Sequence, residues 1–231
     1  MGKDIIRYTP NNPARDRNVR NCLLFTASWL LLLSGCGTMP QIVITKDVLT
    51  SEEHARLGLI YESKGETENA ISEYRKAIEK DKNYATAYFN LGNIYLKNGQ
   101  YDKAENYYLS AVEKSPSNGI FYNNLAWLYI YGKNDMDAAE RYANDAIKAD
   151  PAKAYIYLDT LGVIYTYRKD FKKAEDILKD ALNHTPPPDD NNDSQPLIHI
   201  YMHMADIYNK TGDTEKLKDV TEKLLKLIQT H

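Results

Sequence analysis

The chain has 231 residues, 43% of them hydrophobic, and a formal net charge of −3. This length and apolar content fit one solenoid or two small domains. Lysine and arginine do not cluster anywhere in an acidic chain, so the composition gives no support for nucleic-acid binding.

The first 35 residues are predicted to be a secretory signal. Residues 1–21 carry five basic and two acidic residues, and the apolar run from Leu23 to Leu33 follows, too short to span a bilayer comfortably. The run ends in Leu33-Ser34-Gly35-Cys36, which closely resembles the lipobox of bacterial lipoproteins. That resemblance implies cleavage before Cys36, a diacylglycerol on its sulfur and an acyl chain such as palmitate on its new amino group. The alternative is a buried helix with an incidental cysteine.

Lipidation at Cys36 predicts an anchored protein that does not span the membrane, because several acyl chains hold a protein almost permanently at about 0.8 kcal/mol per buried methylene. Gly37 stands where lipoproteins retained in the inner membrane have Asp, so the resemblance favours the outer membrane of a bacterial envelope, facing the periplasm. Cys22 is removed with the signal, and no disulfide is expected. Without residues 1–35, 24 basic and 30 acidic residues remain, a net charge of −6.

Residues 36–50 comprise the lipidated cysteine and a tether. The alternating run from Gln41 to Thr45 suggests at most a lone strand, which is marginal in water. Ser51, followed by Glu53, is predicted to cap the first helix.

The segment 85–118 shows a pattern that organises the remaining chain. Its first half places two tyrosines, a leucine and a glycine at i, i+3, i+4 and i+7, on one helix face. Its second half repeats this with alanine and tyrosine, and Asn98-Gly99 between the halves suits a left-handed helix end. The residues are Tyr88, Leu91, Gly92, Tyr95, Ala104, Tyr108 and Ala111. The segment therefore predicts helix, tight turn, helix.

The pattern recurs with a period near 34, in residues 51–84, 85–118, 119–153, 155–188 and 198–231. The third copy has one extra residue between its helices, and the last is degenerate. The pattern resembles the tetratricopeptide repeat. The resemblance implies an all-α fold over residues 51–231, a right-handed α-α superhelix of about five helix pairs. It also implies that the signature tyrosines pack in the core; these are Tyr61, Tyr95, Tyr129, Tyr165 and Tyr208.

Residues 185–196, TPPPDDNNDSQP, are predicted to be a flexible loop, because three prolines stop a helix and the polar run has nothing to bury. We interpret it as a connector in preference to a docking motif. An apolar stripe on the final charged helix is predicted to cap the stack. The stripe consists of Leu217, Val220, Leu224, Leu227 and Ile228.

No enzyme and no cofactor are expected, since the sequence has no P-loop, dinucleotide fingerprint, nucleophile elbow or His-Glu-x-x-His motif. His199, His203 and Asp206 are spaced i, i+4 and i+7, and two histidines at i, i+4 can share a metal ion. A third ligand from another element cannot be identified. We therefore predict no metal site and keep these three residues as a weak candidate.

A partner-binding groove is the stronger prediction. Solenoids bind partners on an extended concave surface, and in tetratricopeptide proteins the first helix of each pair lines it. The resemblance places these residues in the groove: Phe89, Asn90, Asn93, Lys97, Asn123, Asn124, Trp127, Tyr131, Asp159 and Tyr167. Asn90 and Asn124 resemble the asparagine ladder of O-GlcNAc transferase repeats, where the side-chain amide grips a peptide backbone. Trp127 and Tyr131 form an aromatic ledge, and Trp127 packing between repeats is the alternative.

The sequence therefore predicts a membrane-anchored scaffold that binds a peptide or protein partner, with no nucleic acid, as a monomer. Resemblance to pilus-biogenesis and envelope-assembly lipoproteins suggests a role in assembling a larger machine. The alternative is a regulatory subunit that recruits a periplasmic hydrolase or peptidoglycan enzyme. The carboxylate clamp of chaperone-binding repeats is poorly matched, because Ala55 and Leu59 replace its first pair, so recognition of an acidic C-terminal tail is not predicted.

Overall fold

The computed structural model describes residues 47–187 and 194–229. The predicted signal, Cys36 and residues 37–46 of the tether lie outside the described residues, as do 188–193 of the predicted loop and the last two residues. Within the described ranges the chain forms ten α-helices and no strand, which confirms the predicted all-α fold. No helix in these ranges is long and apolar enough to cross a membrane.

The helices form five consecutive pairs, as expected for a superhelix of about five helix pairs. The pairs are α1 (Ser51–Ser63) with α2 (Thr67–Lys80), α3 (Ala85–Lys97) with α4 (Tyr101–Lys114), α5 (Gly119–Leu128) with α6 (Met136–Ala149), α7 (Ala154–Tyr167) with α8 (Phe171–His184), and α9 (Gln195–Thr211) with α10 (Thr214–Gln229). A π-helical turn, η2 (Tyr129–Lys133), follows α5, and a 3-10 turn, η3 (Pro151–Lys153), precedes α7.

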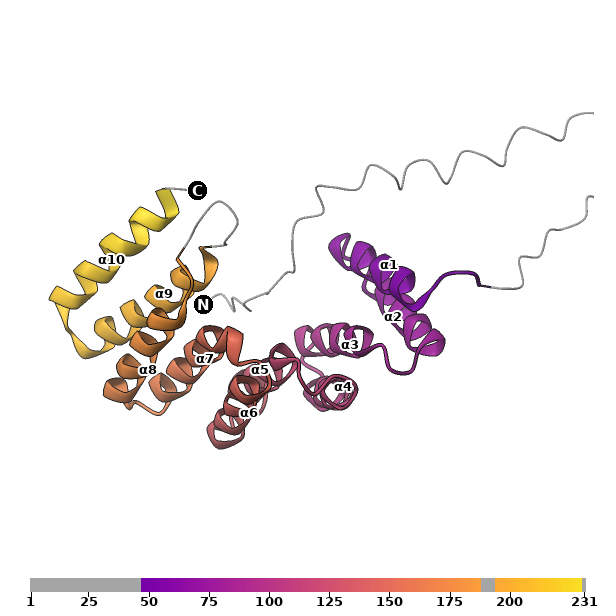
Figure 1. Ribbon diagram of the computed structural model, residues 1–231, viewed down its shortest axis with the longest axis horizontal. Helices are drawn as coiled ribbons and strands as arrows, with labels where there is room; N and C mark the ends of the chain where they lie inside the picture. The colour runs from indigo at the N-terminus through magenta and orange to yellow at the C-terminus, as the bar shows by residue number, and fades with distance from the viewer. Residues whose placement is uncertain (1–46, 188–193, 230–231) are drawn as a thin grey trace, which may run out of the picture. The chain divides into compact units, whose positions relative to one another are not determined.

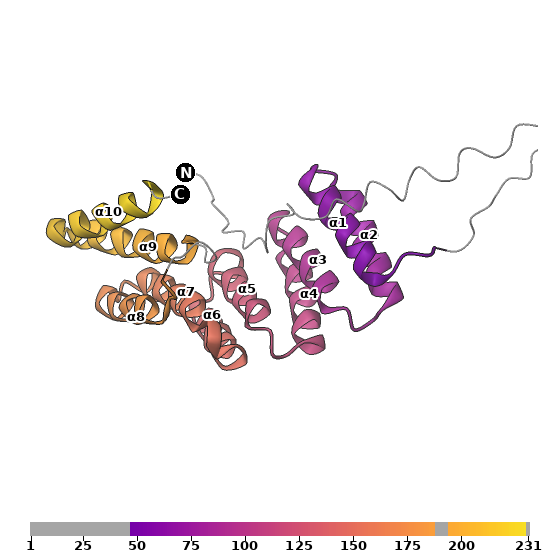
Figure 2. The same ribbon diagram turned by 45° about the horizontal axis from the view of Figure 1, so that its top comes forward.

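Successive pairs pack side by side along the chain (Figures 1 and 2). Each second helix contacts the first helix of the next pair, from α2 with α3 to α8 with α9. First helices also contact one another, α5 with α7 and α7 with α9. These contacts make the first helices of the later pairs one connected surface.

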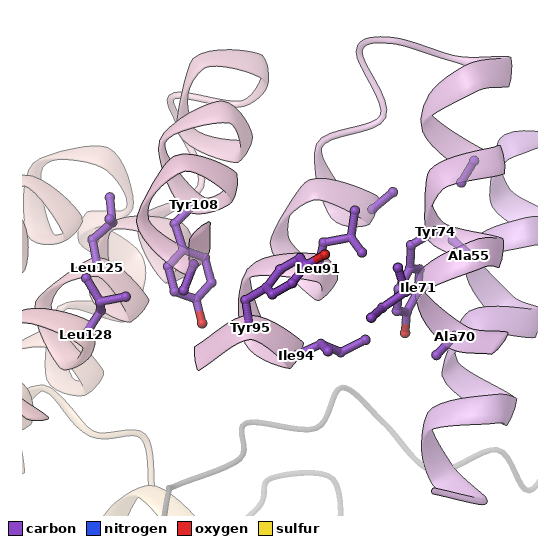
Figure 3. Packing of buried hydrophobic residues seen from close by; sticks show 13 residues of the cluster. Ala55, Ala70, Ile71, Tyr74, Leu91, Ile94, Tyr95, Tyr108, Leu125 and Leu128 are labelled. Carbon is purple, nitrogen blue, oxygen red and sulfur yellow. The ribbon is translucent and has the colours of Figure 1, made fainter. Parts of the chain in front are cut away.

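Within a pair, a small residue on the first helix makes room for a large one on the second. A Cβ atom at Gly92 would overlap the ring of Tyr108, which is fully buried. Gly92 on the first helix therefore leaves room for a tyrosine ring of the second helix. Figure 3 shows Tyr108 among the buried residues of this region, with Ile71 of α2 in the same cluster as Leu91 and Ile94 of α3.

The helix ends follow local chemistry, with two differences from the sequence prediction. Thr50, and not Ser51, caps α1: its hydroxyl oxygen accepts from the Glu53 N–H at 3.2 Å, and the Glu53 carboxylate accepts from the Thr50 N–H at 2.8 Å. The helix α9 begins at Gln195, so Pro196 belongs to its first turn, where proline is tolerated. Gly99 has φ 71°, as predicted for the turn between α3 and α4.

Candidate partner-binding face

The predicted groove residues all lie on α3, α5, η2 or α7, and we call the side of the first helices that carries them the first-helix face. Several large apolar side chains on the first helices, or on the turn after α5, are exposed within the described residues, and of these Tyr131 and Tyr167 are in contact. They are Leu59, Ile60, Tyr131, Tyr167 and Met202. Exposed apolar side chains that gather on one side of a protein commonly mark an interaction surface. The first-helix face is therefore the candidate site.

The extra residue of the third repeat shapes this face. It is accommodated by the π-helical turn at Tyr129–Lys133, after which Asn134 takes a left-handed conformation with φ 53° and Asp135 caps α6. Gly132 lies against the ring of Tyr101, where a Cβ atom would overlap it. This π turn leaves the Tyr131 side chain 53% exposed. Single π turns inside helices are frequent at functional sites.

Three aromatic side chains meet at this turn, and we call them the aromatic patch: Trp127, Tyr131 and Tyr167. The rings of Trp127 and Tyr131 are stacked, with centroids 5.3 Å apart and planes 12° apart. Tyr167 of α7 meets Tyr131 edge-on at 6.1 Å and is 51% exposed. Trp127 is partly buried against a core cluster that includes residues of α5, α6 and α7, and it also stacks on Tyr131.

An acidic side chain lies beside the patch. Asp159 of α7 is only 8% exposed, and its Oδ1 lies 2.7 Å from Nδ1 of His203 on α9. Burial raises the pKa of Tyr131, and Tyr167, Asp159 and Asp206 raise it further. Burial lowers the pKa of His203, but the charge and hydrogen bond of Asp159 outweigh it, so this pKa lies above its ordinary value. Residues of three repeats thus meet in one place.

The predicted asparagine ladder takes a different form in the structure. Asn124 donates its amide N–H to the Ile120 carbonyl of its own helix at 2.9 Å. Asn93 accepts from the Tyr108 hydroxyl at 2.7 Å. Within the described residues, the buried side-chain polar atoms without a hydrogen-bond partner are Nδ2 of Asn90 and Oδ1 of Asn123. Of the two predicted ladder residues, Asn90 therefore keeps a buried amide nitrogen without a hydrogen-bond partner, and Asn124 is held within its own helix.

Of the other predicted groove residues, Phe89 packs against neighbouring rings and Lys97 is exposed to solvent. Phe89 is partly buried, with its ring centroid 4.9 Å from that of Phe121 and 5.8 Å from that of Tyr108. It therefore joins the second repeat to the third. Lys97, at the end of α3, is exposed.

The weak metal candidate is not assembled. Among the residues that the structure describes, no group of three or more His, Cys, Asp or Glu side chains is placed to hold a metal ion. His203 directs its Nδ1 to Asp159, and Asp206 pairs with Lys210 at 2.5 Å. His199 lies partly buried on the same helix.

Sequence reasoning missed a set of polar contacts that join the later repeats, which we call the junction triads. In each, a glutamate of one repeat accepts from the signature tyrosine of the next repeat, and a lysine or arginine of that next repeat pairs with the same glutamate. The triads are Glu105–Tyr129–Lys133, Glu140–Tyr165–Arg168 and Glu175–Tyr208–Lys216. The available signal was an Ala-Glu pair at the same register of the second, third and fourth repeats.

Comparison with protein families identifies the repeats. Tetratricopeptide repeat family models match residues 58–99, 85–118 and 198–231. A model of the Est1 DNA/RNA binding domain matches residues 104–144, a segment with three basic and five acidic residues in this chain. No curated protein matches the chain by sequence.

Solved structures share the fold. BtubC from P. vanneervenii superposes with a TM-score of 0.67 at 21% identity, over 78% of this chain and 80% of that one. PilW, a widely conserved type IV pilus biogenesis factor, superposes with a TM-score of 0.66 at 20% identity, over 78% of each chain. PilF of Pseudomonas aeruginosa gives 0.63 at 20% identity, over 76% of this chain and 75% of that one. At these identities the likeness shows the fold alone.

Proposed function

Because the chain carries tetratricopeptide repeats, a fold of protein–protein interaction scaffolds, we propose that it holds a protein or peptide partner against its first-helix face. The aromatic patch carries this proposal. Two tyrosines that are half exposed and in mutual contact present large, rigid contact area, and aromatic residues of this kind dominate the binding energy of interfaces. Two buried amide atoms without a hydrogen-bond partner, Nδ2 of Asn90 on α3 and Oδ1 of Asn123 on α5, lie on the same first helices.

The scaffold acts from a membrane in this proposal. The lipobox-like sequence that ends at Cys36 supports a lipid anchor, and the tether that follows leaves the repeats free to reach a partner. Gly37 supports the outer membrane, with the repeats facing the periplasm. The fold shared with PilW and PilF supports a role in assembling an envelope machine such as a pilus.

The partner site is tested by photo-crosslinking in intact cells. A photo-reactive amino acid at Tyr131 should capture one dominant protein. The same amino acid at Leu109, which is 40% exposed on the second helix α4, is the matched control and should not capture it. Equal capture at both positions, or none at Tyr131, would contradict the proposed site.

The anchor is tested by Cys36→Ser. Labelling with palmitate should be lost, and the protein should leave the membrane fraction or remain unprocessed. Cys22→Ser, which changes the other cysteine, should keep both labelling and membrane association. Membrane retention and labelling in Cys36→Ser would show that the lipobox-like sequence is not used.

A further inference from the structure

The residue immediately before the signature tyrosine is buried in every repeat except the first. It is isoleucine or leucine in all five repeats: Ile60, Ile94, Leu128, Ile164 and Ile207. Its side chain is 2% exposed or less in the last four repeats, whereas Ile60 is 49% exposed. Figure 3 shows the reason, since Ile94 points from α3 towards Ile71 on the second helix of the preceding repeat. The described residues include no repeat before α1, so the outer side of α1 keeps an apolar position of the repeat junction exposed.

The last helix has the complementary feature at the other end of the described chain. The twelfth residue of each second helix is apolar, and in the first four repeats it is partly buried against a core cluster that includes the first helix of the next repeat. These residues are Ile78, Val112, Ile147 and Leu182. The twelfth residue of α10, Leu225, is 51% exposed, and Ile228 is 55% exposed. The end repeats of a solenoid normally turn a polar face outwards. Of the predicted capping stripe, Val220 is buried but Ile228 is not, so α10 leaves apolar surface at this end.

We propose that these two surfaces bind each other, so that α10 of one copy of the chain packs on α1 of a second copy. The contact continues the packing of α2 on α3 and of α8 on α9, with Leu225 at the register of Leu182 and Ile60 at the register of Ile94. A second copy is the occupant because one chain carries both halves of a repeat junction, and a head-to-tail contact joins two different surfaces of the same protein. The inference goes beyond the proposed function, since neither surface includes the aromatic patch, and it replaces the predicted monomer.

The charges at the two ends agree with this direction of packing. Glu140, near the start of α6, accepts from Tyr165, near the end of α7, so neighbouring helices of successive repeats run antiparallel. In the same arrangement the end of α10 lies at the start of α1 of the second copy. Lys226 is in the last turn of α10, and Glu52 and Glu53 are in the first turn of α1. Opposite charges across an interface steer association and help to select the partner.

Photo-crosslinking between differently tagged copies tests the contact. A full-length copy with one affinity tag carries a photo-reactive amino acid at Ile60, and it is produced in the same cells as an otherwise unchanged copy with a second tag. Illumination should give a product of two chains that holds both tags, and peptide mapping should place the link in α10 of the second copy. The same amino acid at Leu109, which is 40% exposed on α4, is the matched control and should give no such product.

A substitution in the second copy tests the opposing surface. Leu225→Lys should lower the yield of the doubly tagged product roughly tenfold or more, because it places a charge where the leucine side chain is removed from water. Leu109→Lys in the second copy is the control and should leave the yield unchanged. The reciprocal experiment does not depend on the folding of the Leu225→Lys variant. A photo-reactive amino acid at Leu225 should link to α1 of the second copy, and Ile60→Lys there should lower that yield in the same way.

Several results would overturn the inference. They are the absence of a doubly tagged product from both positions, a link that maps outside α1 and α10, and a yield that survives both lysine substitutions. Capture of a different protein, or of residues 1–46 of the chain, in place of α10 or α1 of a second copy would also overturn it. These outcomes are separate from those at Tyr131, because a partner held on the first-helix face does not require contact between copies.

Discussion

The first junction between repeats packs an apolar side chain where each of the three later junctions has a glutamate that contacts a tyrosine. At the later junctions a glutamate accepts from the signature tyrosine of the next repeat. At the first junction the corresponding position is Ile71, which is buried in the same apolar cluster as Tyr95. The Tyr95 hydroxyl instead accepts from Arg75 of the preceding repeat at 3.2 Å.

The same position of the repeat can therefore hold either an apolar side chain or a glutamate without a change of fold. Ile71 removes apolar area from water, an interaction with no directional requirement and little dependence on pH or salt. A glutamate at that register satisfies a buried hydroxyl and a cation together, which depends on its charge and on geometry. Nearest-neighbour interfaces largely set the stability of a solenoid, so the two kinds of junction should respond differently to mutation and to pH.

The largest effect is expected at the apolar junction. Ile71→Ala should lower the free energy of unfolding of this region by about 2 to 4 kcal/mol, because it removes buried methyl groups and leaves a cavity. Hydrogen exchange should show faster opening of α2 and α3. Ile60→Ala, at an exposed isoleucine on α1, is the control and should stay within about 0.5 kcal/mol of the parent. A loss at position 71 no larger than the control would show that apolar burial does not hold this junction.

A smaller effect is expected at a polar junction. Glu140→Gln keeps the shape of the side chain but removes the charge that Tyr165 and Arg168 contact, and should cost about 1 to 2 kcal/mol. Exchange should quicken in α6 and α7 and stay unchanged in α1 and α2. Glu113→Gln, at an exposed glutamate on α4 paired with Lys114, is the matched control and should cost less than about 0.5 kcal/mol. An equal loss of unfolding free energy in the two variants would show that the Glu140 contact contributes no more than an exposed ion pair.

The sequence predicts packing inside a helix pair better than it predicts contacts between repeats. The spacing of Gly92 and Tyr108 is dictated by packing inside a pair, so helix pairs, turns and core tyrosines were predictable from the pattern. A glutamate on a second helix has the same local pattern whether it faces solvent or a tyrosine of the next repeat. Glu105, Glu140 and Glu175 recur at one register of the sequence, but only the three-dimensional stack shows that each of them contacts a tyrosine of the next repeat.

On the first-helix face, too, some features follow from the sequence and others depend on the fold. The sequence placed Trp127 and Tyr131 one turn apart, and this spacing allows the stacking of their rings that the structure shows. The exposure of Tyr131 depends on how the extra residue of the third repeat is accommodated. The sequence placed that residue in the turn between the two helices, whereas the structure extends α5 by the π-helical turn Tyr129–Lys133. The orientation of Asn124 depends on competition from the carbonyl of Ile120 within its own helix, and the pairing of Asp159 with His203 joins residues 44 apart. Such contacts need the fold.

The smallest effect is expected from a change of pH, which should act on the junctions that contain Glu140 and Glu175 and not on the first junction. Burial raises the pKa of Glu140 and of Glu175, but hydrogen bonds from Tyr165 and Arg168, and from Lys179, Lys216 and Tyr208, outweigh it, so both values lie below the ordinary 4.5. A carboxylate with a lowered folded pKa contributes stability that is complete above its unfolded pKa and is lost as the pH falls through the folded value.

Lowering the pH from 6 to 3.5 should therefore weaken the two junctions that contain Glu140 and Glu175 by about 0.2 to 1 kcal/mol per glutamate and leave the first junction unchanged. Hydrogen exchange at the two pH values, corrected for intrinsic rates, should show added opening in α6 to α9 but not between α2 and α3. Glu73, whose pKa is also lowered, pairs with His54 inside the first repeat, so its protonation affects α1 with α2 and leaves the contact of Ile71 with its cluster intact. The variant Glu140→Gln/Glu175→Gln should lose the acid response of α6 to α9, because neither junction then has a carboxylate to protonate. An unchanged acid response in that variant would show that the carboxylates of Glu140 and Glu175 do not cause it. An equal acid response at the first junction would show that the apolar and polar junctions do not differ in their dependence on pH.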